Sequence, residues 1–271
     1  MREGHVRGLS GFVSFVGVAL VLGACEQPPP KQSEPSATAR PTAIAPPPTP
    51  TATEAKTAEK PARPRKKLED CPSGTKVSFE TPAFEEEVRR KLPKPTGDIT
   101  KADLARLKSL NVSSLKFPDL DPCVFTHMTG LKELFLGPGE YDDLSPIKNS
   151  TKLESLRASI SQVRDISVLS EMTKLDRLDL GRTQVADLKP LAGLKLLSEL
   201  QLDDTPVSDL APLAKLEKLE RLSVQRTRVK DASPLKGLKN LKFLYVAGSP
   251  VEEDQTSLGP VRANGAKVMT Q

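Results

Sequence analysis

The sequence is poor in the side chains on which most catalytic and metal sites depend. It has no tryptophan, 4% aromatic residues, two histidines and three cysteines among its 271 residues. A metal site would have to rely largely on carboxylates, and the sequence carries no motif of that kind, so neither a metal nor another cofactor is expected. His5 falls in the leader described below and His127 is expected to be structural, which leaves no catalytic constellation. We therefore expect a protein that is not an enzyme.

Charge and composition narrow the class of partner and the size of the folded part. Lysine and arginine exceed aspartate and glutamate by 40 to 35, which gives a net charge of +5. This mild excess differs from the clustered basicity of nucleic-acid-binding proteins, so no nucleic-acid partner is expected. With 25 prolines and 37% hydrophobic residues, part of the chain is expected not to fold.

Residues 1–24 have the order of a secretory leader. Arg2 and Arg7 come first, the apolar run 11–22 follows, and small residues close the segment. The apolar run is short for a membrane span, so we expect the leader to be removed.

The end of this run, Leu22-Gly23-Ala24-Cys25, resembles the bacterial lipobox. The resemblance implies that the thiol of Cys25 is lipidated and that Cys25 becomes the mature N-terminus, so the protein would be held on a membrane by its acyl chains. The alternative is an ordinary signal peptide with an incidental cysteine. Because Glu26 rather than aspartate follows the cysteine, the same resemblance implies the outer membrane in a Gram-negative host, on an undetermined face.

The segment 25–70 is expected to be a disordered tether behind Cys25. It has 11 prolines between residues 26 and 70 and hardly any large apolar side chains, so it cannot bury enough surface to offset the entropy of ordering it. Its reach lies between roughly 40 and 140 Å, depending on how fully it is extended. The basic run 63–67 is expected to be solvated, with contact to anionic lipid or cell-wall polymer as the alternative.

Residues 71–130 are expected to form a helical N-terminal cap and a degenerate first repeat. Apolar residues at helical spacing predict a helix over 82–92, and Thr100 with Asp103 predicts the capped start of a second helix that continues through Leu110. Two cysteines are left after lipidation, and in an exported protein they most simply form a Cys71–Cys123 disulfide. Two separate buried thiols are the alternative.

The segment from Leu131 to about residue 250 repeats every 22 residues without insertion. Apolar residues recur at repeat positions 1, 4, 6, 11, 14, 17 and 20, and Ser150 is the one polar exception in five complete units. Positions 4 and 6 predict a short strand, and positions 11, 14 and 17 predict a tight turn and a 3₁₀-like return. Aspartate recurs at position 13, where its carboxylate can accept backbone N–H groups.

No unit can bury its leucines alone, so the units must stack. The pattern L-x-x-L-x-L-x-x-T-x-V-x-D-L-x-P-L-x-x-L resembles the 22-residue repeats of the internalin family, and the stretch 84–110 resembles its helical cap. The resemblance implies an α/β leucine-rich-repeat solenoid with a curved parallel sheet, a short 3₁₀ or turn-like convex side and a protein-binding role. Position 9 carries threonine or serine where that family often has asparagine, so we expect a thinner hydrogen-bond ladder. Residues 251–271 are expected to form a C-terminal cap that closes the sheet with Val268, or else a frayed tail.

Repeat positions 3, 5, 7 and 8 are expected to project from the concave sheet. Across neighbouring strands they predict two charge ladders, Arg177-Glu199-Arg221 and Arg182-Asp204-Arg226, and they place Asp203 and Asp204 on a solvent-facing strand. Aromatic and arginine side chains anchor interfaces, so these positions supply the candidate binding residues. The candidates are Phe135, Arg157, Arg177, Asp179, Arg182, Gln201, Ser223, Phe243 and Tyr245. Whether the aromatic residues face solvent or pack under the caps stays open.

These features predict a monomeric, noncatalytic scaffold that is lipid-anchored at the bacterial cell envelope. The first expected partner is an unidentified protein. Cell-wall or surface polysaccharide is the main alternative, with Phe135, Arg157 and Tyr245 as the residues that would contact sugars, and a purely structural envelope component is the third.

Overall fold

The computed structural model describes residues 65–270. The leader, Cys25 and most of the proline-rich segment therefore lie outside the described residues. The hydrophobic core runs from Val77 to Ala266, so the described part contains a complete core of its own. No helix within 65–270 has the length and apolar character needed to span a membrane.

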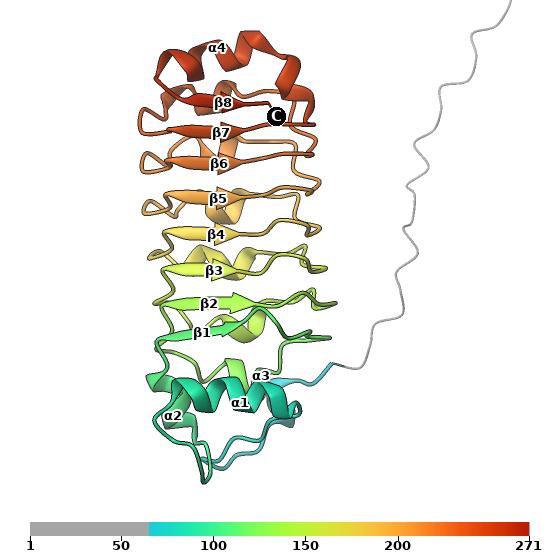
Figure 1. The fold of residues 1–271 in the computed structure, drawn as a ribbon, viewed down its shortest axis with the longest axis vertical. Coiled ribbons are helices and arrows are strands. Elements are labelled where there is room, and N and C mark those ends of the chain that lie inside the picture. Colours follow the sequence, from blue (N-terminus) through green and yellow to red (C-terminus); the bar gives the residue numbers. More distant parts are fainter. Residues whose placement is uncertain (1–64, 271) are drawn as a thin grey trace, which may run out of the picture. The chain divides into compact units, whose positions relative to one another are not determined.

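Eight parallel strands form one sheet, and their order in the sheet is their order in the sequence (Figure 1). The strands are β1 (Ser109–Val112), β2 (Glu133–Leu136), β3 (Ser155–Arg157), β4 (Arg177–Asp179), β5 (Glu199–Gln201), β6 (Arg221–Ser223), β7 (Phe243–Tyr245) and β8 (Lys267–Met269). The 22-residue repeats predict the six strands β2 to β7. The degenerate first repeat adds β1 and the C-terminal segment adds β8, so the sheet is wider than the repeat alone predicts.

The register of the sheet follows the repeat. Leu134, Leu156 and Leu178 are paired across neighbouring strands, and each is buried. A fixed repeat length places the same position of every unit at the same height, so each leucine packs against its equivalent in the next layer. The polar exception obeys the same rule, because buried Ser150 donates a hydrogen bond of 3.1 Å from its hydroxyl to the carbonyl of Met128.

The returns between strands are 3₁₀ helices, as the spacing of the apolar residues and of the aspartate predicts. They are η2 (Ser145–Ile147), η3 (Ser167–Glu171), η4 (Lys189–Leu191), η5 (Ala211–Leu213) and η6 (Ser233–Gly237). In every complete repeat the position-13 aspartate accepts a hydrogen bond of 2.7 to 2.9 Å from the backbone N–H two residues later. These carboxylates satisfy donors that the short helix cannot pair internally, which fixes where each return begins.

The hydroxyls at position 9 hold the turn that follows each strand. Thr183, Thr205 and Thr227 each donate to the carbonyl three residues earlier, at 2.6 to 2.8 Å. These bonds stay within one repeat, so they do not link layers, in agreement with the thinner ladder predicted from the sequence. Ser249 differs, because its hydroxyl accepts from the Thr227 N–H and donates to the carbonyl of Val224 in the preceding repeat.

The N-terminal cap contains α1 (Pro82–Lys91), α2 (Lys101–Arg106) and α3 (Pro122–Phe125). Thr100 and Asp103 form the predicted capping box of α2. The prediction that this helix continues through Leu110 is wrong, because the chain turns at Leu107 and Leu110 lies in β1. Pairing with the next repeat explains the change, since the carbonyl of Lys108 accepts the N–H groups of the first residues leading into β2.

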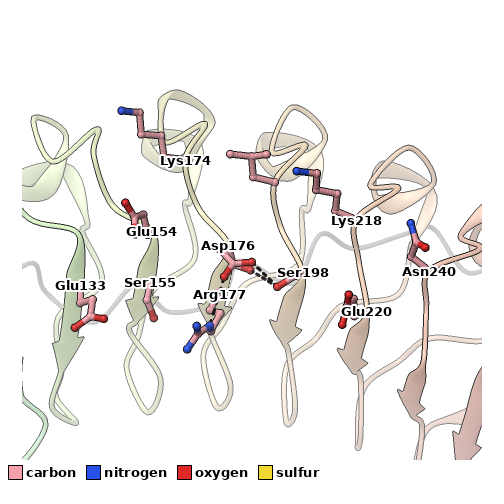
Figure 2. A pocket seen from close by; sticks show the side chains of 11 residues that line it. Glu133, Glu154, Ser155, Lys174, Asp176, Arg177, Ser198, Lys218, Glu220 and Asn240 are labelled. Carbon is pink, nitrogen blue, oxygen red and sulfur yellow. Dashed lines mark hydrogen bonds and ion pairs between the residues drawn. The ribbon is translucent and has the colours of Figure 1, made fainter.

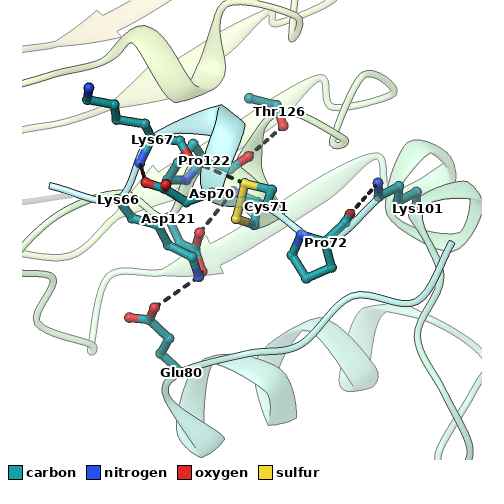
Figure 3. Close-up of a disulfide and its surroundings, with 11 residues drawn as sticks. Lys66, Lys67, Asp70, Cys71, Pro72, Glu80, Lys101, Asp121, Pro122 and Thr126 are labelled. Atoms are coloured by element: carbon teal, nitrogen blue, oxygen red, sulfur yellow. Dashed lines mark hydrogen bonds and ion pairs between the residues drawn. A yellow bond between two sulfur atoms is a disulfide. The ribbon is translucent and has the colours of Figure 1, made fainter. Parts of the chain in front are cut away.

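A disulfide joins Cys71 to Cys123 and ties the start of the described chain to α3 (Figure 3). This confirms the predicted pairing. The sequence predicted that the basic residues just before the disulfide are solvated. In the structure, two of them instead form ion pairs with the folded unit. Arg65 contacts Asp142 at 2.6 Å, and Lys66 bridges Glu80 at 2.9 Å and Asp121 at 3.1 Å. The last residues of the tether are thus part of the folded unit.

The C-terminal cap consists of η7 (Pro250–Glu253), α4 (Gln255–Ala263) and β8. Leu258 and Val261 of α4 are buried, and this helix packs on the 3₁₀ side at the end of the stack (Figure 1). Val268 pairs with Leu244 and extends the parallel sheet beyond β7, as expected of it.

Replacing both Cys71 and Cys123 by alanine is expected to lower the free energy of unfolding by about 4 kcal/mol, because the disulfide restricts a loop of 52 residues in the unfolded chain. Urea unfolding of the variant and of the wild type measures this difference. Reduced wild type should show the same loss. A double variant as stable as the oxidised wild type would contradict the structural role of the bond.

Candidate functional site

The outward side chains of the strands form two parallel rows. We define the outer sheet face as these rows together with the turn residues at repeat positions 7 and 8. The position-3 row reads Ser109, Glu133, Ser155, Arg177, Glu199, Arg221, Phe243 and Lys267, and the position-5 row reads Asn111, Phe135, Arg157, Asp179, Gln201, Ser223, Tyr245 and Met269. The leucine between the two rows points into the core, because side chains alternate along a strand.

One predicted charge ladder is present at position 8. Arg226 holds Asp204 with two hydrogen bonds of 2.5 and 2.7 Å, and Arg182 approaches the same carboxylate at 3.5 Å. The hydrogen bonds from Arg226 hold the pKa of Asp204 below its ordinary value. Both arginines are more than half exposed, so solvent and salt screen these ion pairs and they add little stability. The main effect of these ion pairs is that the three charged groups already have hydrogen-bond partners on this part of the face.

The other predicted ladder is only half formed. Arg221 contacts Glu199 at 3.2 Å, but Arg177 turns to the neighbouring Asp176 at 3.5 Å instead of Glu199. In the position-5 row, Arg157 contacts Asp179 at 3.1 Å. The exposed Gln201 lies beside this pair in the same row.

The repeat position 8 has a left-handed backbone, which the sequence did not predict. Ile160, Arg182, Asp204 and Arg226 have φ between 52° and 58°, and Gly248 takes the same region with φ 70°. These residues lie in the turn after each strand, so Asp203 and Asp204 belong to a turn and not to a solvent-facing strand. Glycine at residue 248 was the sequence signal for this conformation, since it adopts positive φ without steric cost.

Ser223 is a correction to the expected binding surface. It is only 5% exposed, and its hydroxyl donates to Asp203 at 2.5 Å. The same carboxylate oxygen accepts the backbone N–H of Gln225 at 2.8 Å. Asp203 and Ser223 therefore brace the turn after β6 instead of presenting free polar groups to a ligand.

The C-terminal end of the outer sheet face carries an aromatic patch, which we define as Phe243, Tyr245 and Met269. The two rings are nearly parallel, at an angle of 22°, and their centroids are 6.5 Å apart. Arg221 lies 5.5 Å and Lys267 6.0 Å from the Phe243 ring, one on each neighbouring strand. Such contacts between a cation and a ring face are attractive. The rings are half-buried by these lateral neighbours, while α4 packs on the 3₁₀ side.

Met269 was missed at the sequence level because the regular repeat ends before it. It is 39% exposed and lies opposite Tyr245 in the register. The alternation Lys267-Val268-Met269, with the apolar valine facing inward, fits a strand, but three residues are too few for periodicity alone to identify one. Phe135, at the other end of the position-5 row, is half-buried between Asn111 and Arg157.

The described chain offers no cluster suited to metal binding: within 65–270, no three histidine, cysteine, aspartate or glutamate side chains come together in a suitable arrangement. His127 is half-buried in the loop after α3, and burial together with the charge of Lys101 lowers its pKa.

Solved structures with the same architecture include two from Listeria monocytogenes and one from Leptospira interrogans. An internalin (inlF) from Listeria monocytogenes matches with a TM-score of 0.61 and 26% identity, over 71% of this chain and 63% of the internalin. Internalin C2 (inlC2) of the same organism matches with a TM-score of 0.61 and 26% identity, over 71% of this chain and 94% of that protein. A leucine-rich-repeat protein of Leptospira interrogans has a TM-score of 0.50 and 19% identity, over 63% of this chain and 51% of its own length, which supports the fold alone.

The fold is thus a leucine-rich-repeat solenoid similar to those of internalins. The chain spans less than two thirds of the inlF internalin and nearly all of internalin C2. Sequence comparison found no matching protein-family model and no matching curated protein.

Ile160 gives a direct test of the left-handed turn. A β-branched residue at φ 58° is strained, and its 43% exposure means that little packing compensates. The Ile160→Asn variant is expected to gain about 1 kcal/mol in free energy of unfolding, because asparagine tolerates this region better. Urea unfolding measures the gain. Arg182→Asn is the matched control, with a smaller effect expected because arginine is not β-branched. A clear loss of stability in Ile160→Asn would contradict the assigned backbone.

Proposed function

We propose that this protein is a membrane-anchored, noncatalytic scaffold of the bacterial cell envelope that binds a protein partner through its outer sheet face. The observation that carries the proposal is the aromatic patch on a face whose other charged groups are largely paired with each other. The leucine-rich-repeat fold supports a scaffold role in general terms, and the particular surface is argued from the residues of this chain.

The chemistry of the patch matches that of an interface centre. Aromatic residues, methionine and arginine are enriched at protein interfaces, and a few such residues supply most of the binding energy. Phe243 lies between Arg221 and Lys267 and stacks on Tyr245, so the Phe243 ring has little rotamer entropy left to lose when a partner binds. The charged centre of the face, in contrast, already satisfies its own groups through Asp179, Glu199 and Asp204.

The membrane anchor is the part of the proposal that rests on the sequence. Lipidation of Cys25 would attach the mature chain to a membrane, with the outer membrane as the expected site in a Gram-negative host. Residues 26–64 would then separate the acyl chains from the solenoid by tens of ångströms, which leaves room for a partner at the outer sheet face.

The three residues that the sequence suggested for polysaccharide binding, Phe135, Arg157 and Tyr245, do not form one site. Phe135 and Arg157 lie on adjacent strands, but Tyr245 lies on β7, four strands beyond β3. At about 4.8 Å between strands, that is roughly 19 Å, so the three residues cannot surround a single sugar. A glycan could still use the aromatic patch by itself, and the experiment below separates the two classes of partner.

Placing a photo-crosslinking amino acid at Tyr245 in the full chain in its host is expected to trap one discrete protein, identified by mass spectrometry. The matched control is the same amino acid at Ala186, which is exposed in the turn opposite the strand starts. Phe243→Ala should abolish the Tyr245 crosslink by removing the neighbouring ring. No crosslink at Tyr245, or the same products from Tyr245 and Ala186, would contradict the proposal. Sedimentation with purified wall polymer that Phe243→Ala abolishes would favour the glycan instead.

A further inference from the structure

The five complete repeats, residues 131–240, hold 18 basic and 17 acidic residues, but the two signs are separated between the two edges of the solenoid. We define the strand-start edge as repeat positions 18–22, the turns that lead from each 3₁₀ helix into the next strand. In the five complete repeats this edge holds eight lysines and two acidic residues, Glu171 and Glu217. The eight are Lys148, Lys152, Lys174, Lys195, Lys215, Lys218, Lys236 and Lys239. The edge is therefore strongly basic.

The opposite edge has the reverse sign. We define the strand-end edge as repeat positions 7–13, which follow each strand. Over the same five repeats it holds nine acidic and five basic residues. The acidic residues are Glu140, Asp142, Asp143, Asp165, Asp187, Asp203, Asp204, Asp209 and Asp231. The near-zero sum along the sequence thus becomes an electrostatic dipole across the width of the stack.

The side chains of seven of the eight lysines of the strand-start edge have no hydrogen-bond or ion-pair partner in the described chain. The exception is Lys195, which donates to the carbonyls of Ala192 and Lys215 at 3.1 and 3.2 Å. All eight are exposed, and none forms an ion pair with any residue of the described chain. By contrast, Lys132 and Lys242, which lie at the strand starts themselves, are each paired with a glutamate at 2.7 Å. Seven ammonium groups without partners along one edge repel one another, so the row points to an anionic surface outside the molecule.

The identity of the basic residue also differs between the edges. The seven arginines of the five repeats all lie on the strands or the strand-end edge, and none lies at the strand starts. Arginine suits fixed, bidentate contacts, and several of these arginines make ion pairs on the outer sheet face. Lysine is a mobile point charge, which suits a surface of many interchangeable anions better than a single shaped site.

A groove of about 640 Å³ lies where this edge meets the strand starts (Figure 2). Its charged lining consists of Lys174, Lys218 and Arg177 together with the carboxylates of Glu133, Glu154, Asp176 and Glu220. Lys174 and Lys218 point outward from the turns, away from Glu154 and Glu220 at the strand starts. Both glutamates are already neutralised, by Lys132 and Lys242 respectively. Leu196 also lines the groove. It occupies the same repeat position as the two lysines, in the repeat between them, and is 41% exposed. Lys174 and Lys218 are therefore the unpaired cations at the rim of this groove, with the apolar Leu196 between them.

We infer that the strand-start edge docks on an anionic phospholipid surface. The inference rests on the proposed membrane anchor, which would place such a surface within reach of the solenoid. Five repeats spaced about 4.8 Å apart spread the lysines along roughly 19 Å, so several headgroups are contacted at once. The edge precedes the strands, whereas the aromatic patch lies on β7 and β8 themselves, so docking through the lysines leaves the patch open to a partner.

The test uses the chain from Glu26 to Gln271, made without leader and acyl chain, and vesicles of phosphatidylcholine with or without roughly one third phosphatidylglycerol. Co-sedimentation is expected only with the anionic vesicles and is expected to weaken as salt is added. Each lysine near an anionic surface contributes about a fivefold change in partitioning, so K174Q/K218Q/K239Q should bind on the order of a hundredfold more weakly. These side chains are exposed and unpaired, so the variant should keep its fold, which circular dichroism checks.

The matched control is R164Q/R228Q/K230Q, which removes the same net charge from exposed residues of the strand-end edge. It should retain nearly all vesicle binding. Equal losses in the two variants would mean that net charge or the tether is responsible, and would overturn the inference. Failure to bind anionic vesicles, including the case in which the edge binds an acidic polypeptide instead, would also overturn it. The outcome is independent of the anchor, because this chain carries no lipid and mass spectrometry of Cys25 tests lipidation separately.

Discussion

One constraint organises this protein: a single 22-residue unit cannot bury its own leucines and must be covered by the unit before and the unit after it. Strict repeat length satisfies the constraint, because it places Leu178 on Leu156 and under Leu200 in exact register. The same stacking decides where every polar residue lies. Rows of equivalent positions become the outer sheet face, the 3₁₀ side and the two edges, and the caps exist because the first and last layers would otherwise expose leucine.

Local chemistry that repeats was predictable from the sequence. The position-13 aspartates cap the returns and the position-9 hydroxyls hold the turns, because each needs only neighbours within its own repeat. The ends were less predictable. Leu110 lies in β1 and not in a helix, since pairing with β2 outweighs the local helical spacing. The strand around Val268 has only three residues, too few for periodicity alone to establish that it joins the sheet.

The sequence predicted which residues lie on the candidate surface, but not which contacts their side chains make. Phe243 and Tyr245 lie on the outer sheet face as the spacing requires, whereas Ser223 turns inward to Asp203 and Arg177 chooses Asp176 over Glu199. Such choices depend on which of several side chains within reach gives the best geometry, and spacing does not encode them. The left-handed backbone at Ile160 was not predicted either, because Gly248 is the one glycine at this repeat position and therefore the one residue type there that indicates positive φ. The strand-start edge, in contrast, can be derived from the sequence alone, but only when the lysines are sorted by repeat position.

Deleting one whole repeat tests the stacking account most directly. Removal of residues 153–174 brings Glu133 beside Arg177 and Lys132 beside Asp176, so the new layer contact keeps its register and its charge complementarity. The account predicts a folded protein with one strand fewer and a single cooperative urea transition at lower denaturant concentration. Removal of residues 153–163 breaks the register and should abolish that transition. A 22-residue deletion that unfolds the protein as completely as the shorter one would contradict the account.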